Sequence, residues 1–560
     1  MGKQEEVFMR LAWGLPFVLA LGCLGYVACQ APPREPLPET INAESLLEHI
    51  TFLSSDELEG RAPGSPGETK TIEYLTNHFR DFGLAPGNPD GTYVQKVPLV
   101  RLTRAEPRSF VVRHGSDSTR LEQTREFSAF TEQVEEAIRT EGELIFAGYG
   151  VQAPEYDWDD FKGVDLTGKI LLVLVNDPPV PPGPDGEAIF GGPAMTYYGR
   201  WSYKFEIAAK VGAAAAFVIH QAEPAGYPWE VIADTDNVKF VLPSTGGEHK
   251  LLDVEGWLHV DAARKILAMA GQDFDQLYAA AATRSFQPVP LGITAEIDVM
   301  NSVETLDSAN VVAKLEGTES PDECMIYVAH WDHLGIDRSL EGDQIFNGAL
   351  DNASGTAGLL EIAEAFGRLE HGLRRTVLFV AVTAEEQGLL GSRYYGRNPL
   401  YPPEKTVAAI NMDGINLWGP TRDVTIVGMG QSTLDELASR VAGEQGRILR
   451  PDAEPEKGFY YRSDHFELAK IGIPAFDPDG GIEYIGQPEG WGIEMRRRYT
   501  NEDYHKPSDE VKDYWDLSGA VEDLELFYRM GYELASGTDW PEWSEKSEFR
   551  AIREAGRAHR

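Results

Sequence analysis

Runs of apolar and β-branched residues mark the second half of the chain and predict its buried strands. The clearest runs are residues 325–329, 376–383 and 407–412. Unbroken runs of this length are typical of strands covered on both faces, as in a parallel sheet. Polar residues follow these runs within three positions: His330, the pair Glu385-Glu386, and Asp413. Because open α/β sheets bind ligands at the carboxyl ends of their parallel strands, the pattern predicts a functional site at this edge.

Apolar residues at helical spacing occur between and around these strands. They lie in residues 72–82, 359–369 and 517–534, and each set predicts an amphipathic helix. Asp351 stands where the second of these helices is expected to begin. It is either the helix cap or a metal ligand, and its two carboxylate oxygens allow both. Strands followed by helices in this way favour the α/β class.

The polar residues at the strand ends, together with Asp351 and His505, form the inventory of a two-metal hydrolase site. They are His330, Asp351, Glu385, Glu386, Asp413 and His505. Two imidazoles and three carboxylates can bind metal, and one carboxylate is left as a general base. Adjacent residues of an extended chain point in different directions, so we assign Glu386 as a ligand and Glu385 as the base. The glutamate pair alone would indicate only a solvated loop, but three strand ends with matching chemistry favour the metal site.

Two further polar residues follow His330. Zinc-bound histidines usually donate their second ring N–H to a carboxylate, and Asp332 is the local candidate for that acceptor. His333 is either a group beside the site or a hydrogen-bonded structural histidine, and the sequence leaves this open. Residues 336–350 are polar and predict a loop near the site.

The motifs resemble those of the M28 family of co-catalytic zinc aminopeptidases. The matching pieces are His330-x-Asp332, residues 351–355 (DNASG), Glu385-Glu386, residues 411–413 (NMD), residues 463–466 (SDHF) and Tyr504-His505. The resemblance implies a zinc exopeptidase fold, with a mixed, mainly parallel sheet flanked by helices. It also implies two Zn²⁺ per chain, with manganese and cobalt left open as the native metal.

The resemblance implies a role for each residue. One ion would be held by His330, Asp351 and Asp413, and the other by Asp351, Glu386 and His505, so that Asp351 bridges the two ions. Glu385 would take a proton from the metal-bound water, whose pKa falls from about 16 toward about 7 on binding. Tyr504 would stabilise the oxyanion of the transition state.

The predicted activity is that of an exopeptidase that removes N-terminal residues from peptides through a metal-bound hydroxide. A carboxypeptidase or dipeptidase is the nearest alternative, and it would need cations such as Arg462 or residues 496–498 (RRR) to hold a substrate carboxylate. A glutaminyl cyclase would use one metal, which the full ligand set argues against. A non-catalytic binding protein on the same fold would have lost ligands, and here each of them is present.

The N-terminal residues predict export as a bacterial lipoprotein. Lys3 and Arg10 precede a nearly unbroken apolar stretch over residues 11–27, which resembles a signal peptide. Small residues before Cys29 resemble a lipobox, with Cys23 as a weaker rival. Because Gln30 follows in place of an aspartate, we expect a lipid-anchored protein of the cell envelope at the outer membrane, facing the periplasm or the exterior.

The remaining chain divides by its patterns. Gly148-Tyr149-Gly150, residues 165–169 (DLTGK), the strand pattern 170–175 and the helical pattern 204–212 occur in order and resemble a protease-associated (PA) domain inserted in the peptidase. The predicted parts are a signal (1–29), a Pro-rich tether (30–45), the first part of the peptidase domain (46–140), the inserted β-rich PA domain (141–290), the catalytic core (300–540) and a charged tail (541–560).

Charge excludes one class of partner. The chain has 90 acidic and 50 basic residues, a formal net charge of −40. Such a balance argues against nucleic-acid binding. The expected partner is the peptide substrate that the resemblance implies. The oligomeric state is not predicted. The third cysteine, Cys324, lies on the approach to His330 and is expected to be a buried core residue without a disulfide partner in the mature chain.

Overall fold

The computed structural model of the protein describes residues 41–180, 189–190, 192, 194–233, 238–243 and 250–558. The predicted signal segment with Cys23 and Cys29, and most of the tether, lie outside these residues. The lipid anchor and the envelope location therefore stay predictions. Within the described ranges, no helix has both the length and the apolar character needed to cross a membrane.

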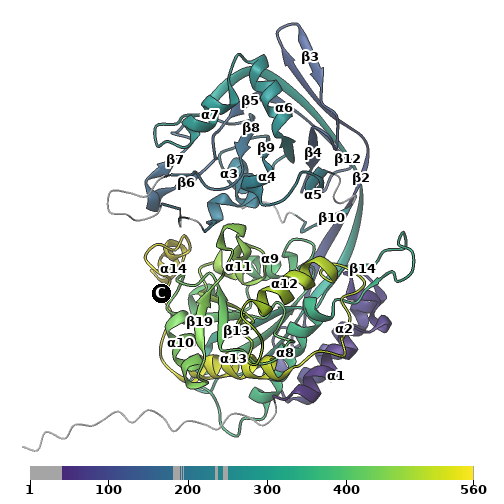
Figure 1. Cartoon of the computed structure of the whole chain (residues 1–560), viewed down its shortest axis with the longest axis vertical. Helices are drawn as coiled ribbons and strands as arrows, with labels where there is room; N and C mark the ends of the chain where they lie inside the picture. Colours follow the sequence, from purple (N-terminus) through teal and green to yellow (C-terminus); the bar gives the residue numbers. More distant parts are fainter. Residues whose placement is uncertain are drawn as a thin grey trace, which may run out of the picture. The chain divides into compact units, whose positions relative to one another are not determined.

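A mixed sheet forms the centre of the C-terminal half (Figure 1). Its strands lie in the order β19 (Ile448–Pro451), β18 (Asp423–Val427), β20 (Ala475–Asp479), β17 (Thr406–Asn411), β13 (Ser320–His330), β16 (Arg375–Val382) and β12 (Val289–Leu315). Strand β13 is parallel to its neighbours β16 and β17, and β17 is parallel to β20. Strands β12 and β16 are antiparallel. The predicted mixed, mainly parallel sheet is confirmed.

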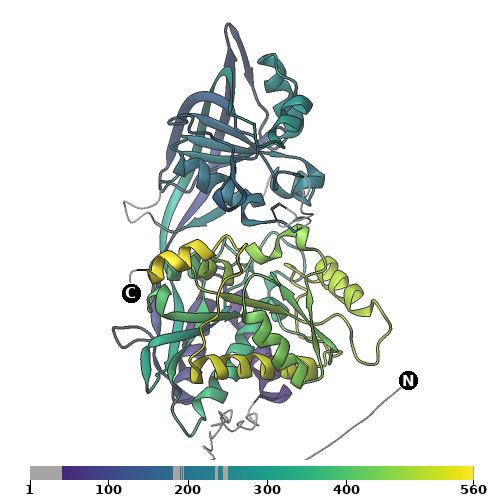
Figure 2. The same ribbon diagram turned by 90° about the vertical axis from the view of Figure 1, so that its left-hand side faces the viewer.

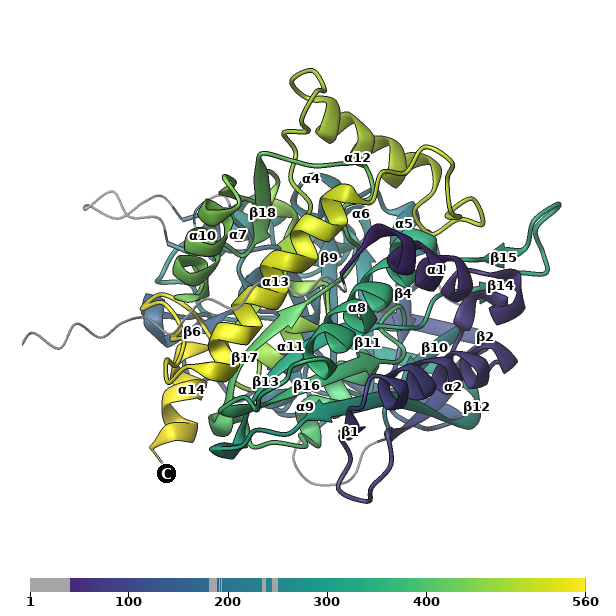
Figure 3. The same cartoon turned by 90° about the horizontal axis from the view of Figure 1, so that it is seen from below.

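Helices cover the central strands on both faces, which explains their unbroken apolar runs. Figure 3 shows one layer, formed by α1 (Ala43–Leu53), α2 (Pro66–Asp81), α8 (Gly355–Gly367) and α13 (Ser518–Ser536). Tyr327 of β13 faces this layer and donates a hydrogen bond to the Phe527 carbonyl of α13 (2.8 Å). The alternate residues Ile326 and Val328 pack with Tyr395 and Leu468, which belong to α9 (Leu390–Arg397) and α11 (His465–Ala469). The helices predicted within 72–82 and 517–534 correspond to α2 and α13.

Two long strands continue the sheet into a β-rich part (Figure 2). Strand β2 (Val94–His114) pairs antiparallel with β12 along most of its length, with one register shift between Asp298 and Met300. Strand β12 then pairs with β5 (Ala137–Phe146). The order continues through β8 (Ile170–Leu174), β9 (Ala215–His220), β11 (Val254–His259) and β4 (Phe127–Phe130). The predicted strand 170–175 corresponds to β8 (Ile170–Leu174), and the helix expected at 204–212 corresponds to α3 (Trp201–Lys210). The identification of this part as a PA domain stays a prediction.

Two local expectations can be compared with the structure. The segment predicted as a loop after His333 contains a small antiparallel hairpin, because β14 (Gly335–Ile336) pairs with β15 (Ile345–Phe346). Cys324 is fully buried and is a free thiol, as predicted.

Candidate metal centre

The polar residues at the strand ends meet at one edge of the sheet. His330 is the last residue of β13 and pairs in register with Val382, the last residue of β16. The chain reaches Glu385 and Glu386 three and four residues later, and Asp413 lies two residues after β17. Because β17, β13 and β16 are adjacent, their carboxyl ends present these side chains together. The predicted convergence at this edge is confirmed.

The first group of possible ligands surrounds His330. Its Nε2 atom lies 3.1 Å from Asp413 Oδ1 and 3.4 Å from Asp351 Oδ1. His330, Asp351 and Asp413 together offer ligand atoms that all lie within 4.8 Å of one another. Glu385 Oε2 lies 3.9 Å from the same Nε2 atom, beside this group. One imidazole and two carboxylates are a donor set that suits zinc.

The second group is built on the other oxygen of Asp351. His505 Nε2 lies 3.3 Å from Asp351 Oδ2 and 3.0 Å from Glu386 Oε2. His333 Nδ1 lies 2.6 Å from Glu386 Oε1, and His333, Asp351 and Glu386 also have ligand atoms within 4.8 Å of one another. Asp351 therefore turns one oxygen to each group, as a carboxylate that bridges two ions must.

His333 is the residue of this group that the sequence left open. Its side chain is fully buried, and its ring packs against the backbone at Gly348, where a Cβ atom would lie 2.5 Å from the ring. Its Nε2 atom has no hydrogen-bond partner within the described part of the chain. Its position three residues after His330 was the one hint in the sequence, and this position does not distinguish a ligand from a buried structural histidine.

The backbone around Asp351 is held by an aspartate that the sequence analysis missed. The N–H groups of Leu350 and Asp351 each donate to the carboxylate of Asp509 at 3.1 Å. The chain forms a wide turn over residues 349–354, and helix α8 begins at Gly355. Asp351 is therefore not the cap of this helix, and the capping alternative was wrong. In the sequence, the one hint that Asp509 holds this turn is its position four residues after His505.

Asp332 contacts both His330 and the loop that carries Glu385. The nearer acceptor for His330 Nδ1 is the backbone carbonyl of Asp332 at 3.2 Å, and the carboxylate lies 3.8 Å away. That carboxylate accepts a hydrogen bond from the N–H of Glu385 (3.0 Å). Burial raises the pKa of Asp332 to about 7. Asp332 thus links the first histidine to the candidate base.

The electrostatics of the site fit a cation. Burial, together with the charges of Asp413 and Glu386, raises the pKa of Glu385 well above its usual range. Carboxylates this close repel one another unless they are protonated or share a positive charge. Two divalent ions would relieve this repulsion, and the nitrogen and oxygen donors match zinc.

Tyr504 stands at the solvent side of the site. Its ring stacks on His505, with the ring centres 3.9 Å apart, and 43% of the residue remains exposed. Burial of part of the side chain and the charges of Asp351 and Glu386 raise the pKa of its hydroxyl above the usual value. The hydroxyl therefore stays protonated at neutral pH and can donate a hydrogen bond.

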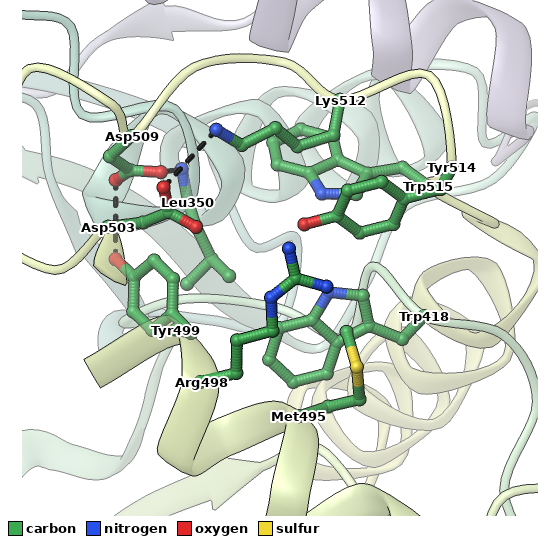
Figure 4. Close-up of a pocket in the computed structure, with 10 residues that line it drawn as sticks. All are labelled: Leu350, Trp418, Met495, Arg498, Tyr499, Asp503, Asp509, Lys512, Tyr514 and Trp515. Atoms are coloured by element: carbon green, nitrogen blue, oxygen red, sulfur yellow. Dashed lines mark hydrogen bonds and ion pairs between the residues drawn. The ribbon is translucent and has the colours of Figure 1, made fainter. Parts of the chain in front are cut away.

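A small pocket is lined by Leu350, which directly precedes Asp351 in the chain, by Trp418 and by residues of the segment 495–515 (Figure 4). Tyr499 donates to Asp509 at 3.2 Å, and Lys512 donates to Asp503 at 3.2 Å. The aromatic part of the lining is formed by Trp418, Tyr514 and Trp515. The pocket shares Asp509 with the metal centre, so its shape is coupled to the turn that carries Asp351.

Comparison with known proteins agrees with this geometry. Residues 310–527 match the sequence model of peptidase family M28. This range, 310–527, is called the M28 segment below, after the family model that it matches. All the candidate ligands, as well as Glu385 and Tyr504, lie within this M28 segment.

Relatives and solved structures resemble parts of the chain. An aminopeptidase of Mus musculus, NAALADL1, is 36% identical over 129 residues, which are 22% of this chain and 16% of that protein. A "Probable zinc metalloprotease" of Pyrenophora teres f. teres is 34% identical over 109 residues, 18% of this chain and 22% of that protein. The chain thus spans less than a quarter of the length of both relatives. The structure of an aminopeptidase from Aneurinibacillus sp. strain AM-1 aligns over 90% of this chain and 96% of its own, with 21% identity and a TM-score of 0.48.

Removal of metal is expected to destabilise the folded protein. A ligand that binds only the native state stabilises it by about 2.7 kcal/mol per site at a free concentration one hundred times Kd. Dialysis against a chelator should therefore lower the melting temperature, and added zinc should restore it. Differential scanning calorimetry on the two samples measures this change. A melting temperature that is the same with and without zinc would contradict the metal assignment.

Proposed function

We propose that the protein is a zinc-dependent exopeptidase that removes N-terminal residues from peptides and holds two zinc ions per chain. The observation that carries the proposal is the carboxylate of Asp351, which faces His330 with one oxygen and His505 with the other. His330 and Asp413 complete one site, and Glu386 and His505 complete the other. The two ions would polarise the scissile carbonyl and acidify the attacking water.

Glu385 is the proton carrier in this proposal. Its carboxylate lies beside the first ligand group, and its side chain is 11% accessible, so water and substrate can reach it. Asp332 fixes its backbone N–H, which limits the directions in which the carboxylate can point. Glu385 would accept the proton of the attacking water and return it to the leaving amine. Tyr504 would donate its hydroxyl hydrogen to the oxyanion.

The charges around the site favour an N-terminal over a C-terminal substrate group. The accessible carboxylates Glu385 and Asp413, with side chains 11% and 28% exposed, can accept hydrogen bonds from a free α-ammonium group. The arginines that a carboxypeptidase could use are paired elsewhere. Within the run 496–498, they donate in order to Asp479, Glu494 and Glu502. Arg462 donates to the Lys457 carbonyl at 2.7 Å.

The proposal is tested by hydrolysis of matched substrates by zinc-loaded protein. The panel contains amino-acid amides with a free amine, the same amides with an acetylated amine, and peptides with a free C-terminus. We expect cleavage only where the α-amine is free, with loss of activity on chelation and recovery with zinc. Release of C-terminal residues from acetylated peptides would instead establish a carboxypeptidase. Bound zinc without any cleavage would favour a binding protein.

A further inference from the structure

Arg61 is a fully buried cation outside the M28 segment. It ends the short turn Asp56–Arg61 between helices α1 and α2, and 1% of the residue is exposed. The M28 segment begins about 250 residues later, at residue 310. A buried guanidinium is costly unless its N–H groups are satisfied, so the position of its partners is informative.

The partners of Arg61 are backbone carbonyls on both sides of the metal centre. Its Nε donates to the carbonyl of Trp331 at 2.8 Å. Its Nη1 donates to the carbonyls of Leu53 and Asn347, the latter at 2.6 Å, and Nη2 donates to the carbonyl of Gly348 at 3.0 Å. Trp331 directly follows His330, whereas Gly348 lies three residues before Asp351. The guanidinium of Arg61 thus hydrogen-bonds on one side to the segment that carries His330 and His333. On the other side it hydrogen-bonds to the backbone just before the turn that carries Asp351.

The surrounding segment supports the same contact. Asn347 donates from Nδ2 to the Ser54 carbonyl (2.8 Å) and to Asp56 Oδ1 (2.9 Å). Gly60 has φ +67°, and a Cβ atom there would lie 2.6 Å from the carbonyl oxygens of Gly335 and Phe346. Residues 53–61 therefore lie against both strands of the hairpin that connects His333 to Asp351.

The charge of Arg61 also faces the acidic site. Burial lowers the pKa of its guanidinium to about 10, while the charges of Asp332, Asp509 and Asp351 oppose this shift. The group remains a cation at neutral pH and offsets part of the carboxylate repulsion at the site.

We propose that Arg61 is a positioning residue of the metal centre, which sets the separation between the His330–His333 segment and Asp351 and so controls metal affinity. Residues 53–61 then belong to the functional unit, although they lie outside the M28 segment. The inference rests on the proposed metal-dependent function. It assigns Arg61 no contact with substrate.

The test uses Arg61→Lys, which keeps the charge but removes the planar fork that reaches carbonyls on both sides. Arg375→Lys is the matched control. Arg375 is also 1% exposed and donates to the carbonyls of Leu534, Asp539 and Thr538, away from the ligands. Zinc affinity is measured by isothermal titration calorimetry, and the ligand geometry by the visible spectrum of the cobalt(II)-substituted protein. We expect Arg61→Lys to weaken zinc binding about 10–100-fold, the range for lost outer-shell partners, and to alter the cobalt spectrum, with neither change in Arg375→Lys.

The outcomes separate this inference from the function on which it rests. If wild-type protein binds no zinc, the proposed function fails and the inference with it. If wild type binds zinc and Arg61→Lys has the same affinity and spectrum, only the inference fails. An equal loss in both lysine variants would indicate general destabilisation and would also overturn it. If Arg61→Lys does not fold, Asn347→Ala takes its place, because it removes the two side-chain hydrogen bonds that hold the Arg61 acceptors at 347 and 348 against the segment that ends in Arg61. Wild-type zinc affinity in that variant would overturn the inference.

Discussion

Replacement of Glu385 by glutamine is expected to lower kcat by about 10²–10⁴-fold, the usual contribution of a general base, while zinc content stays unchanged. The amide has nearly the shape of the carboxylate but cannot accept the proton of the attacking water. Glu385 lies 3.9 Å from His330 Nε2 and outside both ligand groups, so its loss should leave the metals bound. The expected pattern is therefore a metal-loaded protein that binds substrate and hardly turns it over.

Steady-state kinetics and elemental analysis of the purified variant measure both quantities. Glu489→Gln, at an exposed position far along the chain, is the control for the chemical change itself. Wild-type turnover in Glu385→Gln would show that another group moves the proton. Loss of zinc from Glu385→Gln would show that Glu385 is a metal ligand.

Replacement of Asp351 by asparagine is expected to remove activity and to weaken both metal sites together. The carboxylate supplies an anionic oxygen to each ligand group, and an amide has one neutral oxygen to offer. Loss of an outer-shell partner lowers metal affinity by about 10–100-fold. We expect a larger fall in zinc affinity here, because Asp351 is proposed as a direct ligand. Zinc titration of the variant should show that both sites are weakened.

Asp343→Asn is the matched control, since Asp343 is an exposed aspartate in the same connection between His333 and Asp351. A variant at Asp351 that loses one zinc and keeps the other at wild-type affinity would show that the carboxylate does not bridge. If Asp351→Asn binds two zinc ions at wild-type affinity, Asp351 is not a ligand of either ion.

The sequence predicted the part of the site that depends on local pattern. The runs before His330, Glu385 and Asp413 are strands, and they are neighbours in the sheet, so their ends converge. A strand that is covered on both faces is apolar at nearly every position, so its run of apolar residues can be recognised in a single sequence. The turn at Asp351 was predicted less well, because its conformation depends on hydrogen bonds to Asp509, more than 150 residues away.

Arg61 and His333 show why the rest of the site could not be predicted. Gly60-Arg61 resembles the opening of bacterial members of the family, but the pattern does not say what the arginine contacts. Only the folded chain brings the carbonyls at 331, 347 and 348 to its guanidinium. His333 has no local feature that separates a ligand from a buried histidine. Its contact with Glu386 joins residues 53 positions apart, which the pairing of β13 with β16 brings together.

Strands β2 and β12 determine how the protein is expected to lose its structure. Strand β12 pairs with β16 near its C-terminal end and with β5 toward its N-terminal end, while β2 pairs with it from Thr294 to Val311. These hydrogen-bonded strands join the β-rich part to the helix-covered part without a linker. Local unfolding in one part is therefore expected to destabilise the other. The β-rich part and the helix-covered part should therefore behave as one cooperative unit, and a destabilising substitution far from the zinc ligands would reduce the fraction of molecules in which the ligands are assembled.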